Sequence, residues 1–262
     1  MVTALHGTPT PGCVVVALLV DITQSQRRWG WMRLVAGPGA YSAVPGLQAA
    51  KVMGSGHGGG FTLRPSASHQ GLVCRFEDAD RALDFLHGEQ VRAFRERARE
   101  CWAGLMAVTS ARGEWDQQGW GLSDEGCSRL SHEREQDLPA AHEPMPLAVL
   151  TRASIHPAKA TAFWRHAPAA QASLDAAQGC LLAAGLGEAP LVRQCTFSLW
   201  QDEPSMLAYT GESAHQQASA AAWRQKFFSE SLFVRMRVLR MAGWWKGRHF
   251  GNGLGWPEVA HG

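Results

Sequence analysis

The alternation of apolar and polar residues predicts two similar sets of strands and helices. A long helix is expected in the first set at 78–99, with Asp78 near its cap. Short helical pieces joined by turns are expected at 22–54, where Pro and Gly recur. Buried or half-buried strands of the first set are predicted at 13–22, 70–76 and 102–112.

The second set repeats this pattern after a polar, glycine-rich stretch. Helices are predicted at 157–166 and 169–184, and another is expected to begin near Ser213 after a turn at 201–204. Strands of the second set are predicted at 147–155, 191–200 and 232–241.

This order of elements predicts an α+β fold made of two ferredoxin-like repeats. Each repeat would bury one face of its sheet under helices, and the two sheets can then pair as an α+β barrel. The expected organisation is a loose extension at 1–12, an N-terminal half at 13–112, a linker at 113–145, a C-terminal half at 146–247 and a tail at 248–262.

Composition narrows the class of protein. The chain has 262 residues, 45% of them hydrophobic and 18% charged, which is typical of a globular protein with a sizeable core. A net charge of +2 without a basic run argues against a nucleic-acid partner. Six scattered cysteines indicate reduced thiols and a cytoplasmic location, and no signal peptide or membrane anchor is apparent.

His215 is the histidine whose placement stands out. It follows Glu212 and Ser213, which are residue types that favour a helix start, so it is expected in the first turn of the predicted helix. A histidine there can be a capping or surface residue, or it can face a ligand bound between the helix and the sheet. The residues alone leave both interpretations open.

Several motifs then match one family in order and spacing. TFSLW at 196–200 precedes DE at 202–203 and SMLAY at 205–209, and FSESLF follows at 228–233. LTRASI at 150–155, FWR at 163–165, GLGEAPLVRQ at 185–194 and MGSGHGGGFTLRP at 53–65 fall in the same register. Across roughly residues 14–247 the chain resembles the spheroidene monooxygenases, which are acyclic carotenoid 2-ketolases.

The resemblance implies a heme b monooxygenase that uses O₂ to introduce a keto group at C2 of an acyclic carotenoid. Two successive hydroxylations at one carbon would give a geminal diol, and dehydration would leave the ketone. His215 would be the axial iron ligand, with His69 and His166 as the next candidates. Electrons would come from an external donor such as reduced ferredoxin, because no flavin, nicotinamide or iron–sulfur motif is evident.

Other residues are expected to complete this site. Arg152 interrupts an apolar strand, and alternation alone leaves open whether it points inward, where it would need an anion, or outward on the solvated face. The LTRA match to the family favours the inward orientation and implies a catalytic and cofactor-binding residue that would contact a heme propionate or the oxygen side. Arg165 and Arg235 are secondary candidates. Gly54, Gly56 and Phe61 lie in the glycine-rich loop, which is expected either to form a flexible lid over the pocket or to approach the cofactor or polyene closely.

Two other functions are compatible with the same barrel. It could bind or sense heme without oxygenating a substrate, or it could serve a heme dehydratase or peroxidase with a small soluble substrate.

The C-terminal segment from Met241 onward, which includes the tail, has four aromatic residues beside basic ones, a composition that suits either a cap on the barrel or peripheral contact with the inner membrane face. The aromatic residues are Trp244, Trp245, Phe250 and Trp256, and the basic ones are Lys246, Arg248 and His249.

Overall fold

The computed structural model describes residues 14–120, 146–189, 191–211 and 226–257. The strands are β1 (Val14–Ile22), β2 (Leu47–Gly56), β3 (Pro65–Phe76), β4 (Ala98–Trp115), β5 (Gln118–Gly119), β6 (Leu147–Ile155), β7 (Cys180–Ala189), β8 (Arg193–Trp200), β9 (Phe228–Trp245) and β10 (Arg248–Asn252). The α-helices are α1 (Arg27–Ala36), α2 (Ala79–His87), α3 (Glu89–Arg97), α5 (Ala160–Trp164), α6 (Ala167–Ala176) and α7 (Glu203–Gly211).

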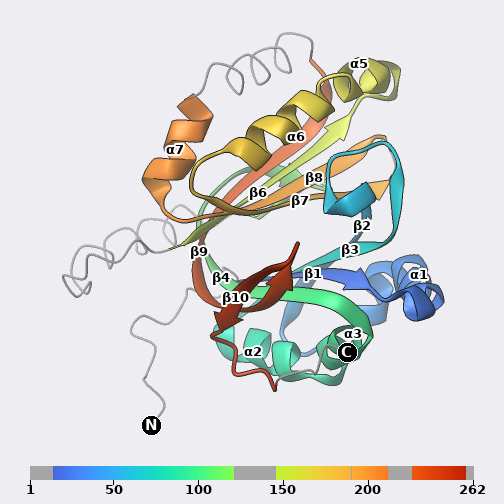
Figure 1. The fold of residues 1–262 in the computed structure, drawn as a ribbon, viewed down its shortest axis with the longest axis vertical. Helices are drawn as coiled ribbons and strands as arrows, with labels where there is room; N and C mark the ends of the chain where they lie inside the picture. The colour runs from blue at the N-terminus through green and yellow to red at the C-terminus, as the bar shows by residue number, and fades with distance from the viewer. Residues whose placement is uncertain (1–13, 121–145, 190, 212–225, 258–262) are drawn as a thin grey trace.

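The predicted pair of ferredoxin-like repeats closes into a barrel. The N-terminal half has the sheet order β2-β3-β1-β4 and the C-terminal half the equivalent order β7-β8-β6-β9, with every neighbouring pair antiparallel. Pairing of β4 with β9 and of β2 with β7 joins the halves at both edges. Figure 1 shows the two helical layers on opposite outer sides of this barrel, α2 and α3 on one side and α5 to α7 on the other.

The barrel confirms the predicted fold class, and the strands predicted for β1, β6 and β8 fall where they were expected. The helix predicted at 78–99 is interrupted, because Gly88 has an extended backbone and separates α2 from α3. Asp78 caps α2, with its Oδ1 atom accepting a hydrogen bond from the backbone N–H of Arg81 at 2.8 Å.

Three elements differ from the sequence prediction. Residues 180–184, predicted as the end of a helix, begin strand β7, because the chain turns at Gly179 with a φ of +76°. Strand β2 occupies part of the segment that was expected to be helical pieces and loop. Helix α7 begins directly after Asp202, whose Oδ1 accepts from the backbone N–H of Ser205 at 2.8 Å, so the predicted turn there is short.

The predicted linker and tail are partly strands. Residues 113–115 continue β4, and the turn after them leads into β5. Residues 248–252 form β10, which pairs with the end of β9. The extension predicted at 1–12 lies outside the described residues. No helix in the described part of the chain is long and apolar enough to cross a bilayer.

The barrel interior is filled by its own side chains. Trp102, Phe197 and Leu150 are among its fully buried members, and the rings of Trp102 and Phe197 lie 5.4 Å apart. An eight-stranded barrel is just wide enough for side chains to fill, and here they fill it. The faces between sheet and helices are therefore where a site is sought.

Candidate functional site

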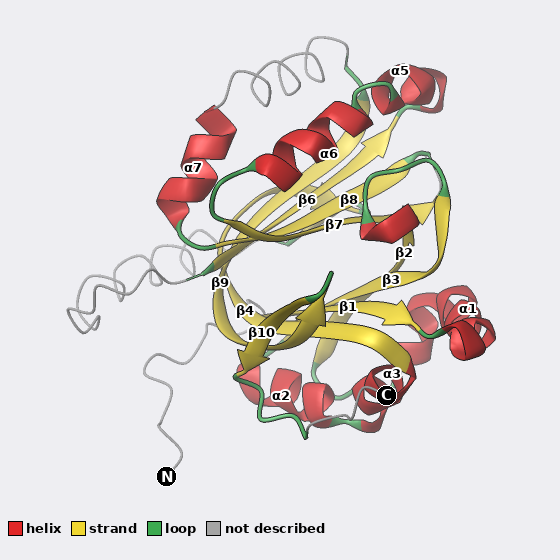
Figure 2. Cartoon of the chain, viewed as in Figure 1, coloured by secondary structure: helices red, strands yellow, loops and turns green. Residues whose placement is uncertain are grey.

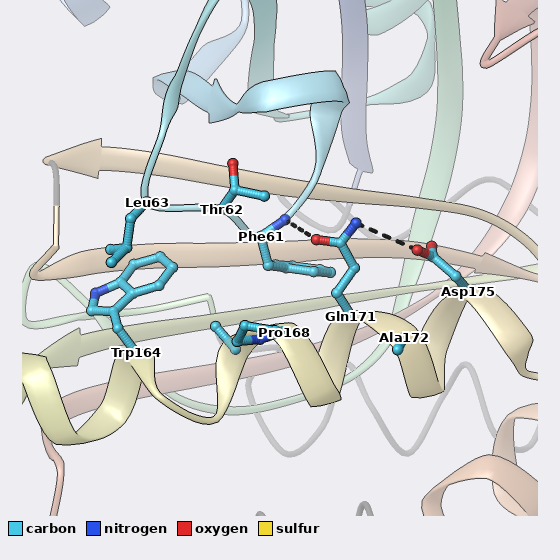
Figure 3. Close-up of a pocket in the computed structure, with 9 residues that line it drawn as sticks. Phe61, Thr62, Leu63, Trp164, Pro168, Gln171, Ala172 and Asp175 are labelled. Atoms are coloured by element: carbon cyan, nitrogen blue, oxygen red, sulfur yellow. Dashed lines mark hydrogen bonds between the residues drawn. The ribbon is translucent and has the colours of Figure 1, made fainter.

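An apolar groove of about 450 Å³ lies between the loop that follows β2 and helices α5 and α6. Figure 3 shows the loop residues lying over α6, with Leu63 close to the indole of Trp164. Pro168 is in the first turn of α6, where its missing N–H costs no helical hydrogen bond, and its ring adds to the apolar wall. The lining residues are Phe61, Thr62, Leu63, Trp164, Ala167, Pro168, Gln171, Ala172 and Asp175.

Gln171 ties the loop to α6. The backbone N–H of Phe61 donates a hydrogen bond to Gln171 Oε1 at 2.8 Å, and Gln171 Nε2 donates to Asp175 at 3.4 Å (Figure 3). Phe61 is buried against Leu174 and Trp200 on the helix-facing side of the sheet. The glycine-rich loop is thus a fixed wall of the groove in this structure.

Glycines allow the loop to lie this close to the sheet and to the helix. A Cβ at Gly60 would lie 2.7 Å from the Gln171 amide nitrogen, and one at Gly185 in β7 would lie 2.6 Å from the carbonyl oxygen of Gly60. A Cβ at Gly56 would collide with that same carbonyl, whereas Gly54 has nothing within 4 Å. The contacts of Gly56 are therefore with the chain itself, and of the two glycines predicted to approach a ligand, Gly54 is the one with open space beside it. The expected approach of these glycines to a cofactor stays a prediction.

The helix-facing side of the C-terminal sheet has unusually small side chains. Thr151 and Thr196 are half-buried cross-strand partners, and Ala183 and Ser198 occupy the next pair on the same face. The equivalent face of the N-terminal half has large, fully buried residues packed on α2 and α3. Ala183 packs in a cluster with Phe61, Leu174 and Trp200, and Ser198 Oγ accepts a hydrogen bond from Trp200 Nε1 at 3.0 Å. Of these four small side chains, Thr151 and Thr196 are the two that stay partly exposed.

Arg152 points into the barrel, on the face of β6 opposite to Thr151. Its side chain is 1% exposed and contacts three carboxylates. It donates to Glu230, lies 3.6 Å from Glu188 and 3.6 Å from Asp116, and its guanidinium is 5.6 Å from the centre of the Trp115 ring. The predicted inward orientation is confirmed, but the anions beside Arg152 are supplied by the protein. Its role toward heme or oxygen stays a prediction.

The charges around Arg152 shift the titration of its partners. Burial raises the pKa of Glu230, but the backbone N–H of Gln117 and the guanidinium of Arg152 outweigh that effect, and the pKa lies below its usual range. The same competition, with Lys51 as the main cation, lowers the pKa of Asp116. Both carboxylates are thus ionised at neutral pH, as the neutralisation of Arg152 requires.

The predicted iron ligand, His215, lies outside the described residues. Of the next candidates, His69 is at the barrel end, with Nδ1 2.9 Å from Ser66 Oγ and 3.6 Å from Asp21. Burial lowers its pKa against the opposing effect of Asp21, so it is held neutral. His166 is exposed at the start of α6, with its ring centre 6.4 Å from that of Phe227.

The secondary arginines and the tail aromatics are placed as follows. Arg235 forms a surface ion pair with Glu203 at 3.6 Å, and Arg165 is exposed. The Trp245 side chain is buried in the barrel core, and Phe250 and Trp256 are buried as well. Trp244 is 40% exposed. Capping of the barrel, one of the two interpretations of the tail, therefore describes Trp245, Phe250 and Trp256.

The groove was only partly predictable. Phe61 and the FWR motif that contains Trp164 were singled out from the sequence, whereas Gln171 and Asp175 were not. A glutamine and an aspartate four residues apart on a polar helix face carry no signal of their own. Their role depends on a contact with a loop that lies 110 residues earlier in the chain.

The fold and groove define an α+β barrel of two ferredoxin-like repeats with a ligand groove outside the barrel. Two aldoxime dehydratase crystal structures share this fold, with TM-scores of 0.57 and 0.56 and identities of 12% and 10%, and one of them is a complex with butyraldoxime. The matches cover 97% and 94% of this chain and 91% and 87% of theirs. No family model matches the chain.

Relatives in sequence are closer. The chain is 44% identical to the spheroidene monooxygenase of Rubrivivax gelatinosus, over 93% of this chain and 89% of that one. It is 32% identical to the spheroidene monooxygenase of Rhodobacter capsulatus, over 78% and 80% respectively. The chain belongs to the spheroidene monooxygenase family.

Proposed function

We propose that this protein is a monooxygenase of acyclic carotenoids that introduces a keto group at C2. The observation that carries the proposal is the 44% identity to a spheroidene monooxygenase over nearly the whole of both chains. Each of two oxygen insertions at the same carbon would consume O₂ and two electrons, with the second oxygen atom leaving as water. Loss of water from the resulting geminal diol then gives the ketone.

The groove supports an apolar, elongated substrate. Its walls are aromatic and aliphatic, from Phe61 and Leu63 on the loop and from Trp164 and Pro168 on the helices. Such walls favour a polyene through apolar burial, and they offer few hydrogen-bond donors to bind a small polar substrate. Gln171 and Asp175 stand at one side of the groove, where their polar groups are satisfied by the loop and by each other.

The cofactor in this proposal is heme b, bound between the C-terminal sheet and its helices. This location is proposed because Thr151 and Thr196 are small, half-buried side chains on the helix-facing side, and because the barrel interior is filled by its own side chains. His215 would hold the iron through its imidazole. Heme supplies binding and activation of O₂, and the chain's own residues hold the substrate carbon near it and exclude water.

The electrons in this proposal come from another protein, with reduced ferredoxin as the donor class. The described elements form a single antiparallel barrel with no parallel nucleotide-binding sheet, and no cluster of three or more metal-ligating side chains occurs among the described residues. Turnover by the purified protein with NAD(P)H alone, free of reductases and peroxide, would contradict this.

The test combines spectroscopy with product analysis. Purified protein reconstituted with hemin is recorded before and after dithionite and CO, and is then supplied with spheroidene and a ferredoxin system. We expect a Soret band, a CO-shifted reduced spectrum and a ketone product. In His215→Ala the Soret band should be lost or strongly weakened, whereas His249→Ala, at an exposed histidine, should keep it. A wild-type spectrum in His215→Ala would reject the axial assignment.

The same experiment separates the alternatives. Heme binding without any oxygenated carotenoid, in the presence of a competent donor, would favour a heme-binding or sensing protein. Ketone formation by protein that contains no heme would overturn the cofactor and leave the substrate assignment standing.

A further inference from the structure

Helix α1 presents an apolar stripe to solvent. Trp31, Met32 and Val35 are 51%, 53% and 82% exposed, and they lie on one side of the helix because their spacing matches the helical repeat. Arg28 extends the stripe by one turn toward the N-terminus, and Arg27 is exposed beside it. An apolar stripe on the outer side of a helix reverses the usual pattern, in which such a stripe faces the core.

The orientation of α1 is fixed by its inner side. Gly30 lies so close to the sheet that a Cβ there would be 3.0 Å from the Gln70 side chain and 3.1 Å from Ile22. Trp29 packs edge-to-face on Phe94 with ring centres 5.0 Å apart. Rotating the helix to bury Trp31 would therefore break well-packed contacts. Figure 2 shows α1 at the outer edge of the N-terminal half, beyond the end of β1.

The segment of the chain that contains this stripe has charged residues of one sign. From Ile22 to Phe76 the sequence contains six Lys and Arg residues and no Asp or Glu. Arg27 and Arg28 form no ion pair among the described residues, and both guanidinium groups are left to solvent. Two exposed arginines beside exposed Trp, Met and Val are complementary to an anionic, partly apolar surface.

We infer that α1 docks this protein on the surface of an anionic lipid bilayer. The apolar stripe would enter the headgroup region, with Trp31 at the boundary, while Arg27 and Arg28 contact lipid phosphates. A free acidic protein would engage the arginines but would leave Met32 and Val35 without apolar burial, so the exposed stripe favours the bilayer. The docking places an enzyme that has no spanning helix in its described part beside a substrate that partitions into lipid.

Vesicle co-sedimentation tests this without any turnover, so its outcome is independent of the proposed function. Vesicles of phosphatidylcholine alone are compared with vesicles that also contain phosphatidylglycerol. We expect binding to the anionic vesicles, weakened about tenfold or more in Trp31→Ser/Met32→Ser. Arg27→Gln/Arg28→Gln should weaken it about fivefold per arginine and reduce its salt dependence. Trp244→Ser, at an exposed tryptophan of the tail, should bind as wild type does.

All of these positions are exposed, so the variants should keep the wild-type circular dichroism spectrum and melting temperature. Absence of wild-type binding to anionic vesicles would overturn the inference, as would equal binding by the Trp31/Met32 variant. A wild-type dimer that becomes monomeric in the Trp31/Met32 variant, without vesicle binding, would assign the stripe to a second copy of the chain. Lost turnover with ferredoxin in the arginine variant, with vesicle binding unchanged, would assign it to the electron donor.

Discussion

The backbone N–H of Phe61 donates a hydrogen bond to the side-chain Oε1 of Gln171, at 2.8 Å. This bond joins the loop after β2, which belongs to the N-terminal repeat, to α6, which belongs to the C-terminal repeat. The loop also lies beside the closure of β2 on β7, which is only two residue pairs long. The groove therefore spans the seam where the two repeats meet.

Removing this bond is expected to loosen the groove more than the barrel. Gln171→Leu deprives the buried Phe61 N–H of its acceptor, which costs about 1–3 kcal/mol of local stability. We expect faster hydrogen exchange and proteolysis at residues 57–64 and a higher KM for the carotenoid. Gln171→Glu with Asp175→Asn is the matched control, because it retains the acceptor for Phe61 without placing two carboxylates side by side, and it should stay close to wild type. Equal effects in the two variants would show that the hydrogen bond does not position the loop.

Arg152 is predicted to be more important to stability than Arg193, the exposed arginine of the same ion-pair network. Arg152→Met leaves Glu188, Glu230 and Asp116 close together without their shared buried cation, and we expect a loss of about 3 kcal/mol in the free energy of unfolding. Urea denaturation measures it. Arg193→Met, at a side chain that is 45% exposed in the same network, should cost less than about 1 kcal/mol.

A double substitution tests the predicted catalytic role of Arg152. If the arginine acts only through its ion pairs, Arg152→Met/Glu230→Gln should be more stable than Arg152→Met alone, and its spectrum with hemin should be that of wild type. A changed spectrum or altered CO binding in a variant that is still folded would instead indicate a contact between Arg152 and the cofactor.

Acid should weaken the ion-pair network around Arg152 and so destabilise the folded protein. The folded-state pKa values of Glu230 and Asp116 are lowered, so their contribution to stability is fully present above the ordinary carboxyl range and is lost as pH falls through the lowered values, from about pH 5 downward. We expect a smaller unfolding free energy at pH 4 than at pH 7. Glu230→Gln should be less stable at pH 7 and less sensitive to acid. Parallel pH dependence in both proteins would show that Glu230 does not carry the effect.

Prediction from sequence succeeded where one physical effect dominated. The continuous apolar run of β1 is buried on both faces, one toward the barrel interior and the other toward α2 and α3, so no other element fits it. Residues 180–184 were misassigned because alanine and leucine favour a helix locally, whereas the strand is stabilised by pairing with β8 and β2. Gly179, which turns the chain, was the available signal.

The site was harder to predict than the fold because its residues come from elements that are far apart in the sequence. Alternation along β6 left both the inward and the outward orientation of Arg152 open, and its partners come from β7, β9 and the turn after β4. No local sequence pattern indicates that these residues lie close together in the fold. The glycine-rich loop was likewise identified as a close-approach segment from its composition, while the partner that it approaches, α6, is fixed only by the closure of the barrel.

Gly54 and Gly56 offer a direct test of what the glycine-rich segment approaches. A Cβ at Gly56 would collide with the carbonyl oxygen of Gly60 and lie 2.8 Å from the backbone nitrogen of Thr62, so Gly56→Ala should destabilise the folded protein by about 1–3 kcal/mol. A Cβ added at Gly54 would have no heavy atom within 4 Å apart from its chain neighbours, so Gly54→Ala should be neutral or stabilising by up to about 1 kcal/mol.

The informative measurement is Gly54→Ala in the presence of hemin and of carotenoid. If Gly54 approaches the cofactor as expected from the sequence, the variant should keep its thermal stability without ligand but bind hemin more weakly or show a shifted Soret band. Unchanged hemin binding with a raised KM for carotenoid would place the substrate beside Gly54 instead. If Gly54→Ala matches wild type in stability, hemin binding and KM, neither ligand approaches this glycine, and its role is confined to the seam between β2 and β7.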